Sequence, residues 1–144
     1  MTYDLHIILR FEIEVKLLEG ALKVADVPAV WNEEFERMFG IKVPNDAQGC
    51  LQDIHWSLGT IGYFPTYTLG NLNAAQLFHR ACTDHPGLNA ELREGRYGTL
   101  LSWLRTRIHQ HGQRHRPLEL MQLATGEPTR AAWHVENLRN KFAS

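Results

Sequence analysis

The sequence lacks several features that would assign a protein to a particular class. It contains no apolar run near the roughly 18 residues that cross a membrane, and Met1-Thr-Tyr-Asp-Leu-His carries an acid where a secretory signal would be basic. Its 15 Lys and Arg residues nearly balance its 16 Asp and Glu residues. With a net charge of -1, no overall field draws it to nucleic acid or to a membrane surface. We therefore expect neither nucleic acid nor a membrane as a partner.

Cysteine is also scarce, since Cys50 and Cys82 are the only two. So few thiols cannot form a disulfide framework, and reduced cysteines are typical of the cytoplasm, which is the expected location. Cys50 lies five residues before His55, but closeness in sequence does not make a nucleophile and its base. A small buried side chain is the commoner role for such a cysteine.

Recognisable metal-binding motifs are missing. No His-Glu-x-x-His occurs, and the nearest similar stretch, His134-Val-Glu136, has the wrong spacing. His109, His111 and His115 lie close in sequence, but spacings of two and four residues do not put three imidazoles on one helix face. A solvated helix end explains them better, because cationic groups complement the negative end of a helix dipole. A metal site is the alternative.

What the sequence does contain is helical periodicity. Apolar residues spaced by three and four predict a first amphipathic helix whose buried stripe comprises Leu5, Ile8, Phe11, Val15, Leu18 and Leu22. A second helix is predicted from an N-cap at Asp26, with Pro28 in its first turn, to Gly40 just past its end. The short connection between them predicts an antiparallel pair.

Further helices are predicted over residues 65–86, 89–111, 117–125 and 129–142, the last one capped by Thr129. Residues 41–62 have no clean period and contain several Gly, Pro, Asn and Asp residues, so we expect a long ordered loop there. The expected fold is therefore all-α, with about six helices in a single domain over residues 1–144.

The candidate site residues gather in the run from Gly49 to Asn71, which is too polar and too rich in glycine for an ordinary core segment. They are Gln52, Asp53, His55, Trp56, Tyr63 and Tyr67. Pro65 can fix the entry into the next helix, so an imidazole N–H and a phenol O–H could converge there and stabilise an oxyanion. Alternatively, these aromatic side chains lie in the core with their polar atoms satisfied. The residue types alone leave both interpretations open.

The same run resembles a signature of the thermostable, Taq-type metallocarboxypeptidases. The matching blocks are Gly49-x-x-Gln52-Asp53-x-His55-Trp56 and Gly62-Tyr-Phe-Pro-Thr-Tyr-x-Leu-Gly-Asn71. The similarity extends over nearly the whole chain, from Thr2-Tyr-Asp-Leu-His to the closing Lys141-Phe142. The resemblance implies a mostly helical, usually homodimeric enzyme that removes C-terminal residues from peptides. It also implies zinc or cobalt held by a His-Glu-x-x-His pair and a downstream Glu.

By this resemblance, His55 and Tyr63 contact the substrate carbonyl or its oxyanion, and Tyr67 is a supporting donor. Gln52, Asp53 and Trp56 orient the substrate or the groups that touch it. The family's metal-binding helix is expected before Thr2, so the chain is expected to be the C-terminal portion of such an enzyme. It would then carry no metal ligands or cofactor and be inactive alone. The alternative is a non-catalytic helical module that binds peptide termini or a partner chain.

Thermal unfolding with and without Zn²⁺ separates the two interpretations of His109, His111 and His115. We expect the melting temperature to change by no more than about 1 °C, because a metal at 100 times its dissociation constant stabilises by about 2.7 kcal/mol and would raise it by several degrees. A rise of that size that disappears in His109→Ala would support a metal site instead.

Overall fold

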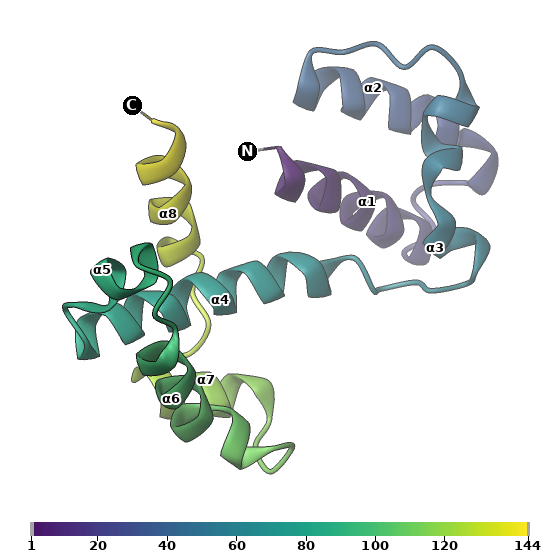
Figure 1. Ribbon diagram of the computed structural model, residues 1–144. Coiled ribbons are helices and arrows are strands. Elements are labelled where there is room, and N and C mark those ends of the chain that lie inside the picture. Colours follow the sequence, from purple (N-terminus) through teal and green to yellow (C-terminus); the bar gives the residue numbers. More distant parts are fainter. Residues whose placement is uncertain (1, 144) are drawn as a thin grey trace. The chain divides into compact units, whose positions relative to one another are not determined.

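The computed structural model describes residues 2–143 (Figure 1). Over that range the chain forms helices and no strand, which confirms the all-α prediction. No helix within it is long and apolar enough to span a membrane. The α-helices are α1 (Tyr3–Leu18), α2 (Val27–Phe39), α3 (Ile54–Ser57), α4 (Pro65–Asp84), α5 (Leu88–Arg93), α6 (Gly98–Arg107), α7 (Pro117–Thr125) and α8 (Ala132–Phe142).

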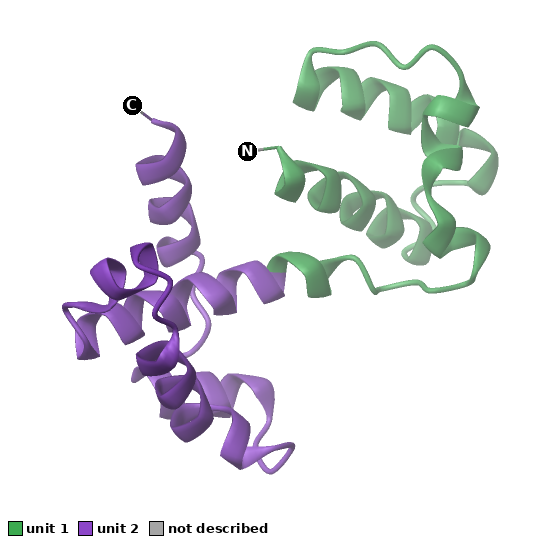
Figure 2. Cartoon of the chain, in the orientation of Figure 1, with its two compact units in different colours: residues 1–68 green, residues 69–144 purple. Residues whose placement is uncertain are grey.

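The chain divides into two compact units, residues 1–68 and residues 69–144 (Figure 2). Unit 1 contains α1, α2, α3 and the first turn of α4. Unit 2 contains the rest of α4 and the helices that follow it. The single domain over residues 1–144 stays a prediction.

In unit 1, α1 and α2 run antiparallel, as the short connection predicts (Figure 1). Leu9 and Ile13 of α1 pack against Val27 and Trp31 of α2 to form the core. Asp26 occupies the N-cap of α2 and Pro28 its first turn, while Gly40 ends the helix with φ 67°. That left-handed conformation suits glycine, which has no Cβ, and the predicted bounds of α2 are confirmed.

The predicted buried stripe is wrong at three of its six positions, while Leu5, Val15 and Leu22 are half-buried. Ile8, Phe11 and Leu18 are exposed, Leu18 to 73%. The buried positions are instead Ile7, Leu9, Ile13 and Glu14. The reason is that the buried face of α1 includes the charged residue Glu14, and a pattern based on apolar residues alone cannot identify such a position. The helix also ends at Leu18. The chain then turns at Gly20, which has φ 73°, so Leu22 lies beyond the helix.

The expected loop over 41–62 is ordered but not free of helical structure. It contains two 3₁₀ turns, Asp46–Gln48 and Cys50–Gln52, followed by α3. Gly49 lies between the turns, where an added Cβ would be 2.7 Å from Val43 Cγ1. Glycine is therefore required at this position by close packing.

In unit 2, α4, α5 and α6 enclose a core of Ala81, Leu88 and Trp103. The Trp103 indole donates a hydrogen bond of 2.9 Å to Asp84 Oδ2, and this bond is the main reason that the pKa of Asp84 lies below its usual value. The single helix predicted over 89–111 is wrong, because α5 ends before Gly95, which has φ 74° and turns the chain into α6.

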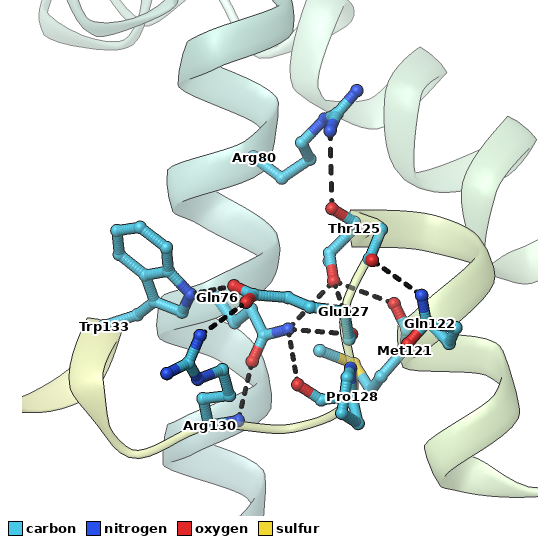
Figure 3. A network of polar contacts seen from close by, with 10 residues as sticks. Gln76, Arg80, Met121, Gln122, Thr125, Glu127, Pro128, Arg130 and Trp133 are labelled. Atoms are coloured by element: carbon cyan, nitrogen blue, oxygen red, sulfur yellow. Dashed lines mark hydrogen bonds and ion pairs between the residues drawn. The ribbon is translucent and has the colours of Figure 1, made fainter.

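The segment between α7 and α8 is fixed by the buried amide of Gln76 on α4 (Figure 3). Gln76 Nε2 lies 2.8 Å from Thr125 Oγ1 and within 3.1 Å of the carbonyl oxygens of Glu127 and Pro128. Its Oε1 accepts a bond of 2.9 Å from the Arg130 amide. One side chain thus holds both ends of the turn that leads into α8.

Thr129 does not cap α8 as predicted. Its hydroxyl donates to Asn73 Oδ1 at 2.6 Å, and Ala131 occupies the N-cap position. The hydroxyl is used to attach the segment to α4 instead of satisfying the first turn of α8. Sequence spacing cannot distinguish these two uses of a threonine.

Replacing Gln76 by Leu is expected to destabilise unit 2 by about 3 kcal/mol, because several buried polar groups lose their partner. Urea denaturation measures the loss. The matched control is Gln113→Leu at an exposed position, which should change stability by less than about 0.5 kcal/mol. Equal stability of the two variants would contradict the role assigned to Gln76.

Candidate functional site

Unit 1 contains a cavity of about 350 Å³ that four of the candidate residues line, namely Gln52, Asp53, His55 and Tyr67. α1 contributes His6 and Arg10 to its wall, and the segment after Gly49 contributes Asp53 and His55. Tyr67, in the first turn of α4, lines it as well. The cavity therefore brings together three segments that are separated in sequence.

Asp53 positions the short helix that carries His55. Its Oδ1 accepts bonds from the backbone amides of His55 at 2.8 Å and Trp56 at 3.0 Å, which caps α3. Its Oδ2 accepts a bond of 2.8 Å from Arg10 Nε. A four-residue helix is not stable by itself. The buried, charge-paired cap is what holds His55 in place.

The imidazole of His55 contacts two tyrosine side chains. Its Nε2 is 3.1 Å from the Tyr67 hydroxyl, and its ring stacks on Tyr63 with centroids 5.8 Å apart. The tautomer decides which of His55 and Tyr67 donates in that bond. The His55 side chain is 24% exposed and Tyr63 is 45% exposed, so solvent and ligands can reach both rings.

Tyr67 stays a hydrogen-bond donor at neutral pH. Burial, and then the nearby Tyr63, Tyr3 and Asp53, raise the pKa of its phenol above the ordinary value of 10.0. With the proton on His55 Nε2, the imidazole donates to Tyr67 and the phenol O–H is free for a third group. In that tautomer the imidazole orients Tyr67, and the two phenols can supply O–H donors to an oxygen that gains negative charge.

The structure brings His55, Tyr63 and Tyr67 together, as the sequence predicts, with Asp53 directly behind them. Gln52 also lines the cavity, and its side-chain amide donates to the Ala47 carbonyl oxygen. Trp56 lies on the core side of α3. Its indole N–H donates to Glu14 Oε1 at 3.0 Å, and its ring meets Trp31 edge-on.

Sequence reasoning missed three residues of α1, namely His6, Arg10 and Glu14. They are spaced by four, so they share one helix face, and this polar row within an apolar helix was a usable signal. Burial, and then the charge of Arg10, lower the pKa of His6, so its imidazole is neutral at neutral pH. Arg10 also crosses the faces of Trp31 and Phe64, at 4.7 and 5.4 Å from the ring centroids.

The family model described as Carboxypeptidase Taq (M32) metallopeptidase matches residues 1–142. The chain belongs to this family. It is 40% identical over 144 residues to carboxypeptidase 1 of Bacillus subtilis and to thermostable carboxypeptidase 1 of Thermus thermophilus. The match covers 100% of the chain but only 29% and 28% of these M32 relatives.

Solved M32 structures have the same fold over this portion. An M32 carboxypeptidase from Deinococcus radiodurans R1 aligns with a TM-score of 0.96 at 40% identity, over 99% of this chain and 29% of that one. Metallocarboxypeptidase 1 of Trypanosoma cruzi aligns with a TM-score of 0.95 at 38% identity, over 99% and 30%. The all-α arrangement is therefore that of a portion of the M32 fold.

A metallopeptidase family implies a metal ion. Within residues 2–143, no three His, Cys, Asp or Glu side chains gather closely enough to hold a metal. His111 and His115 are in ring contact, with centroids 5.4 Å apart, but no third ligand joins them in this range. We therefore derive no catalytic step through a metal from this chain.

Replacing Asp53 by Asn is expected to destabilise unit 1 by about 3 kcal/mol, because it leaves the partly buried Arg10 guanidinium without its counter-charge. The amide oxygen can still cap α3, so the loss reports on the ion pair. Urea denaturation is the measurement. Asp26→Asn, at an exposed N-cap whose side chain makes no capping bond, is the control and should be nearly neutral. A similar loss in both variants would contradict this account.

Proposed function

We propose that this chain supplies the substrate side of the active site of an M32 metallocarboxypeptidase. His55 and Tyr63 contact the peptide carbonyl that is cleaved, or the oxyanion that forms from it, and Tyr67 supports His55. Asp53 orients His55, Gln52 lines the surrounding wall, and Trp56 supports α3 from the core side. The observation that carries the proposal is that His55 and Tyr67 line one cavity in unit 1 and that the exposed Tyr63 ring stacks on His55.

The chemistry of peptide hydrolysis explains why these side chains are suitable. Attack on a peptide carbonyl puts negative charge on its oxygen, and donors fixed in advance stabilise that charge best. Tyr67 keeps its proton at neutral pH, and the capped α3 fixes the position of His55. The metal that the family name implies, zinc or cobalt in our proposal, activates the attacking water when bound. Its ligands belong to the portion of the M32 fold that this chain does not span.

A chimera tests these roles directly. The chain replaces the matching portion of the Thermus thermophilus relative, and release of C-terminal residues from peptides is measured with metal supplied. His55→Ala should lower kcat by about 100-fold or more, and Tyr63→Phe by about 10- to 100-fold, because each removes a donor to the oxyanion.

Matched controls exist in unit 2. His109→Ala and Tyr97→Phe change the same residue types at exposed positions and should leave kcat within about twofold. A folded His55→Ala chimera with the turnover of the unsubstituted chimera would overturn the proposed role. We expect the 144-residue chain by itself to release no C-terminal residue, and metal-dependent release by it would contradict that expectation.

The second candidate is a non-catalytic module that associates with a partner chain or with a second copy of itself. The observation that favours it is an apolar surface hollow of about 340 Å³ in unit 1. Val24 and Leu51 on its rim are 79% and 70% exposed. Exposed apolar surfaces of this kind mark interaction sites. Sedimentation of the chain and of Leu51→Glu tests it, with dissociation expected in the variant. A monomer in both cases would count against self-association.

A further inference from the structure

The buried carboxylate of Glu14 touches both sides of the turn between His55 and Tyr63. Glu14 lies on α1, is 2% exposed and borders the core residues Leu9 and Ile13 of the same helix. A charged group so deeply buried is unfavourable unless its oxygens accept hydrogen bonds. Both oxygens do accept one, and both donors belong to the candidate site segment.

The two donors come from the two ends of one turn. Oε1 accepts a bond of 3.0 Å from the Trp56 indole N–H, next to His55 in sequence. Oε2 accepts a bond of 3.1 Å from the Gly62 amide, next to Tyr63. A single carboxylate therefore fixes the distance between the residue after His55 and the residue before Tyr63.

Apolar packing holds the turn between these ends only weakly. Leu58 is 75% exposed and Ile61 47% exposed, so burial of their side chains contributes little. The Thr60 amide bonds to the His55 carbonyl oxygen at 2.8 Å and closes the first part of the turn. Beyond it, the Gly62 amide donates to Glu14 Oε2.

We propose that Glu14 is a positioning residue that sets the spacing of the His55 imidazole and the Tyr63 phenol. It acts with Arg10, one helical turn earlier on α1, whose bond to Asp53 fixes the start of α3. Arg10 holds Asp53, two residues before His55, and Glu14 holds the turn after His55. The role of this spacing in catalysis rests on the proposed function. The claim that Glu14 sets the spacing does not depend on that function.

Glu14→Gln tests the inference with a side chain of nearly the same shape. A carboxamide offers one oxygen to the two N–H donors and turns its NH₂ group toward the other, so one donor loses its acceptor. In the full 144-residue chain, we expect amide hydrogen exchange at Gly62 to become about tenfold faster or more. The nuclear Overhauser effect between the His55 and Tyr63 rings should weaken.

Ile13→Ala is the matched control, because it removes a buried side chain from the neighbouring position without touching either donor. It should lower stability while leaving the local signals of Gly62 and of the ring pair intact. If Glu14→Gln does not fold, Glu14→Asp is measured in the same way, since its shorter side chain cannot reach both donors. Unchanged exchange and an unchanged ring contact in the folded variant would overturn the proposal.

The chimera gives the functional readout. There, Glu14→Gln should lower kcat by about tenfold with KM within about twofold, because a displaced donor acts on the transition state more than on binding. The two chimera variants are compared under conditions in which they are equally stable. If Glu14→Gln then lowers kcat no more than Ile13→Ala does, the positioning role is contradicted. If His55→Ala retains full turnover, the proposed function fails, and the exchange and ring-contact results in the full chain still decide the structural claim.

Discussion

Unit 1 depends on the way in which α1 presents buried charge to the segment after Gly49. The carboxylate of Asp53 accepts bonds from the His55 and Trp56 amides of α3 and from the Arg10 guanidinium. Without that cap, four residues could not hold a helix, and His55 would have no fixed direction. The core of Leu9, Ile13, Val27 and Trp31 supplies the burial, but the polar contacts give the segment its shape.

Unit 2 uses the same physical device with neutral groups. Gln76 satisfies a hydroxyl, two carbonyl oxygens and an amide of the segment before α8, so one buried side chain replaces the regular bonds of a helix or strand. A segment without secondary structure can only be ordered when its backbone groups find such partners. In each unit, a polar side chain of a long helix bonds to backbone groups of a segment that lacks regular structure.

The sequence predicted the features that local rules govern. The bounds of α2 follow from Asp26, Pro28 and Gly40, and the grouping of His55 with Tyr67 follows from Pro65 at the start of α4. It failed where tertiary contacts decide. The buried face of α1 contains Glu14, which no apolar pattern can reveal. Thr129 bonds to Asn73 instead of capping α8, and a single Gly95 breaks what the apolar spacing presents as one helix.

Glycines near a candidate site are often taken for hinges, and the turn after α3 argues against that view here. Gly59 and Gly62 have φ of 69° and 79°, and the amides of both are bonded, to the Trp56 carbonyl oxygen and to Glu14. These residues set a direction of the chain that other side chains would strain. The turn is therefore held by its own bonds, and the His55 side chain, 24% exposed, is accessible without a change in this backbone.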